Sequence, residues 1–529
     1  MFARAFALST LLLVAIAAPT PAADQPQWGQ RHTRNMVSPE KGLPDGFDPV
    51  TGTNVKWVAP LGSQSYASPI VAGGRVYIGT NNDRPRDPKH QGDRAVLLCL
   101  DERDGHLLWQ LVIPKLSVDY DDPFLDWEKA GFCSEPTIEG NHAYTLTNRG
   151  EIVCLDVKGL TDGNEGPYAD EAKHLAPLHH TPINPGATDA DIVWLTDLVK
   201  DAGIRTHDQV HGSILIDGDL LYVNSCNGKD NTHRRIVTPD APTLVVLDKR
   251  TGRIVSRDDQ RIGPNIFHCA WSSPSLGEVN GKRLIFLGGP DGWCYAFEAL
   301  KEAPPLGPDP ALEELRGPGP ALKNVWKFDC DPAAPKEDVH KYVGNRRVSP
   351  SVIMGMPVFD KGRIYVSAGG DLWWGKRQSW LKCIDAGGTG DVTKTAEVWS
   401  YPLSRETCCT PAVYNGMVFA ADCGGVIHCV DAATGKPFWT HKADGDIWGS
   451  PLVADGKVFV GTRRGEFVVL AADKQKRLIS STRVGEGDDS KINGTVTAAN
   501  GVLYVPTMSK LYALQRPVQA NAGANGVVK

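Results

Sequence analysis

The sequence predicts an all-β fold, an eight-bladed β-propeller built from four-stranded antiparallel blades and closed by an N-terminal strand. Three observations predict it. One pattern of strands and turns recurs eight times along the 529 residues. The last two intervals between copies are 40 and 44 residues, which matches the period of about 40–45 residues of a propeller blade. An unpaired aromatic strand before the first copy supplies the strand that the last copy lacks.

Each copy begins with a small residue and usually proline, followed by a short apolar strand, a glycine turn and an aromatic strand. A third, apolar strand ends in Asp, and a turn and often Trp follow. We expect this Asp, as in Asp101 and Asp431, to accept backbone N–H bonds in its turn. The eight copies start at Pro69, Pro136, Ser213, Pro274, Pro350, Pro411, Pro451 and Thr495.

The two ends of the repeat array complement each other. The eighth copy contains strand patterns at 502–505 and 511–514 but no final Trp strand. The segment Asn54–Val58, which includes Trp57, precedes the first copy and has the character of that missing strand. Pairing it with the last blade leaves no exposed sheet edge between the first and last blades.

The chain outside the strands divides into short segments. The boundaries we predict are a signal peptide at 1–23, an N-terminal extension at 24–53, the propeller at 54–517 and a flexible tail at 518–529. Insertions are expected at about 158–209, with a short helix at 189–202, and at about 302–323. The signal peptide, cleaved near Ala23, predicts export to the periplasm or beyond, and no later segment is apolar enough to span a membrane.

Composition and motifs exclude several functions. The 56 basic and 62 acidic residues give a net charge of −6, so a nucleic-acid partner is not expected. The sequence lacks a Cys-x-x-Cys-His haem motif and a Gly-x-Ser-x-Gly hydrolase elbow. His207 and His211 are four apart, but His211 leads into a strand, so we predict no metal site from this spacing. A monomer is expected.

Several phrases resemble the pyrroloquinoline quinone (PQQ) type repeat, notably residues 429–439 and 450–453. The N-terminal Gln27-Trp28-Gly29 and the stretch 288–293 are similar to exported PQQ-binding-like propellers of the planctomycete type. More distant resemblances are to the propeller subunit of outer-membrane assembly, which carries no quinone, and to quinoprotein alcohol dehydrogenases. The resemblance implies the propeller fold, and PQQ with Ca²⁺ as candidate cofactors.

Aligning the copies identifies side chains that face the propeller axis. The positions two or three residues before each start contain two tryptophans, an arginine, an asparagine and two adjacent cysteines. In quinoprotein alcohol dehydrogenases, a disulfide between adjacent cysteines packs against the quinone. For Cys408 and Cys409, the resemblance leaves two alternatives, such a disulfide or two buried thiols. The candidate cofactor-binding residues are Trp271, Arg347, Cys408, Cys409, Trp448 and Asn493.

A second group of residues is a candidate site for a sugar or peptide ligand. Two tryptophans beside an acid form a plausible platform for a sugar or peptide, because aromatic faces bury area and a carboxylate fixes orientation. These candidates are His211, Asp371, Trp373 and Trp374.

Three functions are compatible with these residues, and no catalytic set is recovered from them. The leading interpretation is an exported, non-catalytic binding module or scaffold for a protein or small ligand at the axial face. The second is a PQQ- and Ca²⁺-dependent alcohol or sugar dehydrogenase, and the third is a carbohydrate-binding propeller.

Overall fold

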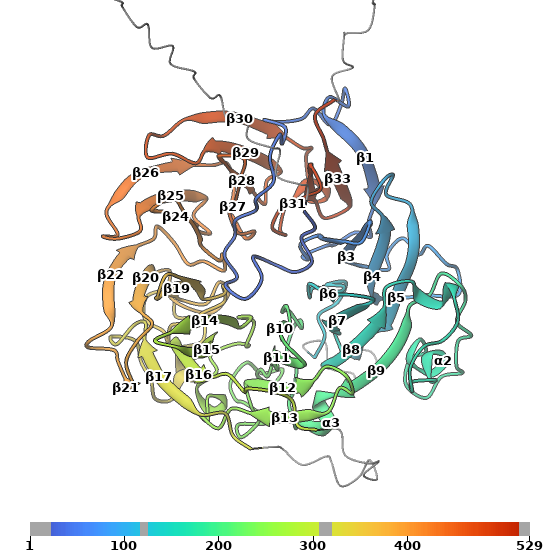
Figure 1. Cartoon of the computed structure of the whole chain (residues 1–529), viewed down its shortest axis with the longest axis horizontal. Helices are drawn as coiled ribbons and strands as arrows, with labels where there is room; N and C mark the ends of the chain where they lie inside the picture. Colours follow the sequence, from blue (N-terminus) through green and yellow to red (C-terminus); the bar gives the residue numbers. More distant parts are fainter. Residues whose placement is uncertain (1–22, 117–124, 306–319, 518–529) are drawn as a thin grey trace, which may run out of the picture.

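A computed structural model describes residues 23–116, 125–305 and 320–517. Eight antiparallel sheets surround a central axis, with the first strand of each repeat innermost and the last at the periphery (Figure 1). The eight-bladed all-β prediction is confirmed. The predicted signal peptide, apart from residue 23, and the predicted tail lie outside the described residues, as does most of the second insertion.

The blades follow the chain in order. Blade 1 comprises β2 (Ile70–Ala72), β3 (Arg75–Asn81), β4 (Arg94–Asp101) and β5 (Leu107–Pro114). Blade 2 comprises β6 (Thr137–Glu139), β7 (His142–Leu146), β8 (Glu151–Asp156) and β9 (Asp191–Asp197). Blade 3 comprises β10 (Leu215–Asp217), β11 (Leu220–Asn224), β12 (Leu244–Asp248) and β13 (Ile254–Arg257). Blade 4 comprises β14 (Ser275–Val279), β15 (Lys282–Gly288), β16 (Trp293–Glu298) and β17 (Asn324–Asp329), with β21 (Gly390–Asp391) added in parallel.

The second half repeats this arrangement. Blade 5 comprises β18 (Val358–Asp360), β19 (Arg363–Gly369), β20 (Ser379–Asp385) and β22 (Glu397–Pro402). Blade 6 comprises β23 (Ala412–Tyr414), β24 (Met417–Ala421), β25 (Val426–Asp431) and β26 (Pro437–Lys442). Blade 7 comprises β27 (Leu452–Ala454), β28 (Lys457–Gly461), β29 (Glu466–Ala471) and β30 (Leu478–Arg483). Blade 8 comprises β31 (Thr497–Ala499), β32 (Val502–Pro506), β33 (Lys510–Leu514) and β1 (Val55–Pro60).

The ring closes as predicted. Strand β1 pairs antiparallel with β33, with Trp57 opposite Ala513, so the front of the chain completes the last blade (Figure 1). The Trp57 side chain is 8% exposed and donates its indole N–H to the Glu102 carbonyl of blade 1 at 3.0 Å. The closing strand therefore also joins blade 8 to blade 1.

The helices are short and lie between strands: α2 (Glu171–His174), α3 (Leu198–Asp201), η1 (Gly159–Thr161), η2 (Gly263–Asn265), η3 (Val339–Tyr342) and η4 (Asp488–Ser490). The helix expected at 189–202 is wrong for most of its length, because β9 occupies 191–197 and only α3 is helical. The apolar residues of β9 cover blade 2, and Trp194 lies opposite Cys154 of β8. This segment is the Trp strand of the second repeat.

The repeated tryptophans explain how blades hold one another. Each lies on the outer strand of its blade and donates its indole N–H to a backbone carbonyl of the following blade. The donor and acceptor pairs are Trp57 and Glu102, Trp109 and Val157, Trp194 and Lys249, Trp326 and Ala386, Trp399 and Ala432, and Trp439 and Asp473. The accepting carbonyl lies in the turn after the repeated Asp. As expected, Asp431 accepts the backbone N–H groups of Ala433 and Thr434 in this turn.

The N-terminal segment, residues 23–40, crosses the axis (Figure 1). It bonds to the innermost strands of blades 1, 2, 4, 5, 6, 7 and 8, through residues from Gln25 to Ser38. Arg34 extends this contact to blade 3. Its fully buried guanidinium donates to both the carbonyl and the hydroxyl of Ser213 and to the carbonyls of Trp28 and Pro274. One segment therefore contacts all eight blades and places Trp28 at the axis.

Candidate functional site: the axial cavity

A cavity of about 390 Å³ lies on the axis beside the N-terminal segment. Its wall is rich in aromatic rings, and a small number of charged and polar groups lie between them. This volume and composition are typical of a site for a small organic ligand. The aromatic lining residues are Trp28, Tyr66, Trp127, Trp271, Trp373, Trp374 and Trp448.

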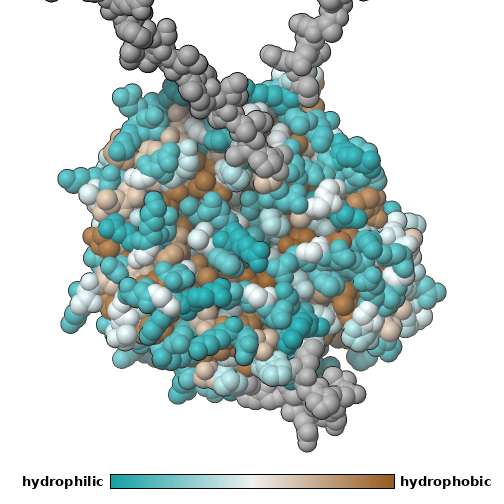
Figure 2. Space-filling view, viewed as in Figure 1, coloured by the Kyte–Doolittle hydropathy of each residue, from teal (hydrophilic) through white to brown (hydrophobic). Residues whose placement is uncertain are grey.

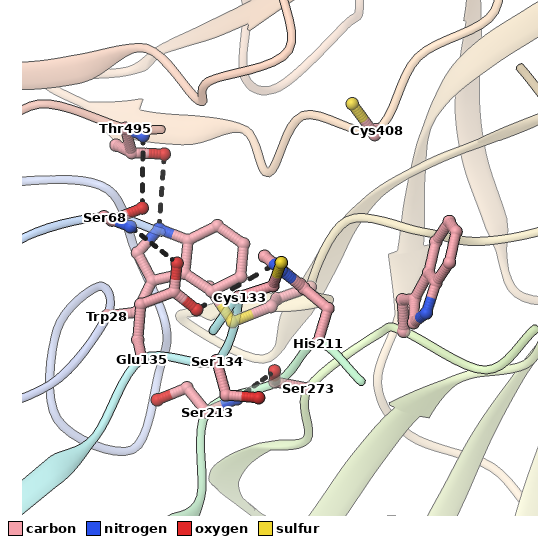
Figure 3. A network of polar contacts seen from close by, with 12 residues as sticks. Trp28, Ser68, Cys133, Ser134, Glu135, His211, Ser213, Ser273, Cys408 and Thr495 are labelled. Carbon is pink, nitrogen blue, oxygen red and sulfur yellow. Dashed lines mark hydrogen bonds and ion pairs between the residues drawn. The ribbon is translucent and has the colours of Figure 1, made fainter. Parts of the chain in front are cut away.

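Trp28 is fixed by polar and aromatic contacts. Its indole N–H donates to Thr495 Oγ1 at 3.3 Å, and the edge of its ring meets His211 at 5.5 Å (Figure 3). The side chain is 8% exposed. Because the N-terminal segment bonds to every blade, this ring forms a rigid part of the cavity wall.

Glu135 supplies a buried carboxyl group to the cavity. Its Oε1 accepts the backbone N–H of Ser68 at 2.9 Å, and its Oε2 lies 3.9 Å from His211 Nε2 (Figure 3). Oε2 is buried and accepts no hydrogen bond from the described residues. Burial raises the pKa of Glu135. A carboxyl oxygen at the wall, with no hydrogen bond from this part of the chain, is a group that a polar ligand can use.

Trp373 lies at the centre of the aromatic wall. Its ring makes edge contacts with Trp271 at 5.5 Å, His268 at 5.4 Å and Trp448 at 5.7 Å, yet the residue is 43% exposed. The guanidinium of Arg463 stacks 3.7 Å from the Trp448 ring. The cavity therefore combines an exposed indole with one cation.

Seven predicted residues lie on the cavity wall. They are Trp271, Cys408, Trp448, Asn493, His211, Trp373 and Trp374. The alignment of the repeats placed the first five, because equivalent positions of a propeller face the same axis. The last two reach the cavity from the loop after β19.

Three predicted residues lie elsewhere. Arg347 belongs to the irregular segment before β18, is exposed and does not line the cavity, whereas Arg463 does. Cys409 is buried, with Sγ near the carbonyls of Trp448 and Gly449. Cys408 and Cys409 are both free thiols in this structure, and Cys408 is half-buried where Cys409 is buried. Asp371 is buried below the tryptophan loop.

Asp371 positions this loop. Its Oδ1 accepts the backbone N–H groups of Trp373 at 3.0 Å and Trp374 at 2.8 Å. Its Oδ2 lies 3.0 Å from His268 Nδ1. The carboxylate therefore orients the two tryptophans and one imidazole, and does not itself face a ligand.

An imidazole-rich cluster borders the cavity. It consists of His207, Asp208, His233 and His268, and Asp208 and His233 also line the cavity. Burial lowers the pKa of His207 to about 3 and also lowers the pKa of His233. Burial opposes a charge on His268, yet the carboxylates of Asp371 and Asp208 raise the pKa of His268 well above its ordinary value.

Sequence reasoning missed Trp28, Glu135, Arg463 and the cluster. Glu135 directly precedes the start of the second repeat at Pro136, so extending the alignment by one position would have found it. Trp28 and the cluster come from the N-terminal segment and from non-repeating loops, for which the repeat gives no position.

The residues fit a PQQ and Ca²⁺ site poorly. Ca²⁺ takes six to eight oxygen ligands, whereas the candidate ligand group beside the cavity is dominated by imidazole nitrogen. In the described part of the chain, the one group of three carboxylates consists of Asp156 at the end of β8 and Asp162 and Glu165 after it, outside the cavity wall.

Comparison with known proteins confirms the expected resemblance to the PQQ-type repeat, to the outer-membrane assembly propeller and to quinoprotein alcohol dehydrogenases. Residues 377–517 match the family described as outer membrane protein assembly factor BamB. A 122-residue stretch is 34% identical to a 1-butanol dehydrogenase (cytochrome c) of Thauera butanivorans, covering 20% of this chain and 18% of that protein. The chain thus spans less than a fifth of that relative.

One solved structure supports the fold. A quinohemoprotein alcohol dehydrogenase from Comamonas testosteroni aligns with a TM-score of 0.56 and 12% identity, over 97% of this chain and 83% of that chain. BamB from Moraxella catarrhalis aligns with a TM-score of 0.48 and 14% identity, over 87% and 96%. Among the described residues, no helix has the length and apolarity to cross a bilayer.

Proposed function

We propose that this propeller is an exported binding protein that takes a small carbohydrate ligand in its axial cavity. The observation that carries the proposal is the exposed Trp373 ring inside a cavity of about 390 Å³. An aromatic face packs against the C–H face of a sugar ring, and a small number of polar groups fix its orientation.

The polar groups around Trp373 suit hydroxyl groups. Glu135 Oε2 accepts no hydrogen bond from the described residues, while His211, Asn493 and Asp208 line the same cavity. A sugar hydroxyl both donates and accepts hydrogen bonds, so it can satisfy a buried carboxyl and an adjacent imidazole together.

The shape of the site favours a small ligand over a protein partner. The cavity has a volume of about 390 Å³, whereas a stable protein interface buries about 800 Å² on each partner. On the face shown in Figure 2, hydrophilic residues predominate and hydrophobic residues form scattered patches. Export is part of the proposal and rests on the character of residues 1–23.

Tryptophan fluorescence can test the proposal. The purified protein is titrated with a panel of neutral mono- and disaccharides, and separately with PQQ plus Ca²⁺. We expect at least one sugar to change the emission saturably. Trp373→Ala should weaken that binding about tenfold, equivalent to about 1.4 kcal/mol, and Glu135→Gln should weaken it through its changed hydrogen-bonding capacity.

Trp380→Ala is the matched control, because this half-buried tryptophan belongs to blade 5 but does not line the cavity. Equal weakening by Trp373→Ala and Trp380→Ala would refute the role of the wall. Saturable binding of PQQ with Ca²⁺, and of no sugar, would replace this proposal with the quinoprotein alternative.

A further inference from the structure

Four side chains from different loops converge beside the axial cavity. His207 and Asp208 lie between α3 and β10, His233 lies between β11 and β12, and His268 precedes β14. Each offers one ligand atom, and these four atoms lie within 4.8 Å of one another. The tertiary fold, and no local motif, brings them together.

The cluster is compact and largely buried. The ring centroids are 4.6 Å apart for His207 and His233, 5.3 Å for His207 and His268, and 6.0 Å for His233 and His268. Asp208 completes the group, with Oδ2 3.0 Å from His268 Nε2 and Oδ1 3.6 Å from His207 Nε2. Metal ligands about 2 Å from one ion lie at most about 4 Å apart, so a small contraction suffices.

A second layer orients one of these imidazoles. Asp371 Oδ2 lies 3.0 Å from His268 Nδ1, which directs Nε2 of that ring toward Asp208. Metal-binding histidines characteristically donate their other ring N–H to a carboxylate in this way. Asp371 is itself fixed by the Trp373 and Trp374 backbone N–H groups.

The backbone is held in uncommon conformations at two of the four positions. Asp208 and His233 have φ values of 58° and 59°, in the left-handed region where side chains cost energy. Close packing supports the arrangement, since a Cβ at Gly228 would lie 2.6 Å from His207 Cβ. Such conformations gather at ligand sites because the surrounding structure enforces them.

We propose that His207, Asp208, His233 and His268 bind one transition-metal ion of the Zn²⁺ class. Three imidazoles and one carboxylate are a donor set for such ions and not for Ca²⁺. Because Asp208 and His233 also line the cavity, the ion would lie at the edge of the ligand site. This proposal goes beyond sugar binding and does not depend on it.

The test uses chelator-treated full-length protein, titrated calorimetrically with Zn²⁺. We expect one high-affinity ion per chain, and visible d–d absorption when Co²⁺ replaces Zn²⁺, which reports the ligand set without an activity assay. His233→Asn should weaken Zn²⁺ binding more than 100-fold. Asp371→Asn should weaken it 10- to 100-fold, as removal of a supporting carboxylate does.

His106→Asn is the matched control. His106 is exposed and belongs to a separate group with the buried Asp101 and the exposed Asp104, and its loss should leave both the stoichiometry and the Co²⁺ spectrum unchanged. No stoichiometric Zn²⁺ uptake by the unaltered protein would overturn the proposal, and so would equal binding by His233→Asn. Because sugar titrations are repeated on the chelated protein, failure of the metal site and failure of sugar binding are separate results.

Discussion

Substitution of Gly435 by alanine tests how neighbouring blades are held together. It lies in the turn between β25 and β26 with φ +69°, and a Cβ there would sit 2.6 Å from the Trp399 ring of blade 5. Gly435→Ala would displace this indole, which is 7% exposed and donates to the Ala432 carbonyl at 3.0 Å. A Cβ on a residue in the left-handed conformation costs about 1–2 kcal/mol. A buried indole N–H that loses its hydrogen bond costs about 1–3 kcal/mol. We expect a total loss of about 2–5 kcal/mol.

Gly416→Ala supplies the comparison within the same blade. Gly416 has φ +74°, but a Cβ there meets no described heavy atom within 4 Å, so only the backbone cost of about 1–2 kcal/mol applies. The free energy of unfolding of each variant is measured by urea denaturation, with the m-value checked for constancy. If both variants lose the same stability, the indole contact does not join the blades and the reasoning is refuted.

Three further predictions concern ring closure, pH and the N-terminal segment. Trp57→Ala should lower the free energy of unfolding by about 3–5 kcal/mol, and a loss below about 1 kcal/mol in urea denaturation would contradict the closing role of β1. Burial raises the pKa of Asp291 from 3.8 to about 6. The folded state therefore holds this proton more tightly, so its contribution to stability falls by about 3 kcal/mol as the pH rises from about 4 to 6. Asp291→Asn should remove that slope, while an unchanged pH profile of stability would count against it. Arg34→Lys keeps the charge but loses the planar fork, so urea denaturation should show a loss of about 2 kcal/mol or more; unchanged stability would show that the four bonds of Arg34 contribute little.

The sequence determined the propeller and its closure because both depend on a repeated pattern. Strands of one blade pair with sequence neighbours, and Trp57 could be recognised as the strand missing from the last repeat. The same regularity placed Trp271 and Trp448 at the axis, since equivalent positions in a ring face the same centre.

The rest of the site lay beyond this pattern. Arg347 was placed at the axis by alignment, but its segment is irregular, and the exposed side chain lies outside the cavity wall. Trp28 and the cluster around His268 come from segments that occur once, and their meeting depends on tertiary packing. In the sequence, the metal-binding signal at His207 is its four-residue spacing from His211. His233 and His268, which approach His207 in the fold, come from distant loops.

The path of residues 23–40 has a consequence for how the molecule matures. Trp28 donates to Thr495, and Ser38 donates to Ala498, which is 460 residues further along the chain, so a chain being synthesised from its N-terminus cannot make these two contacts until blade 8 exists. The Trp28 ring is therefore fixed at the axis only after the final blade has been synthesised. A ligand that contacts this ring would bind the complete propeller and not a shorter fragment of it.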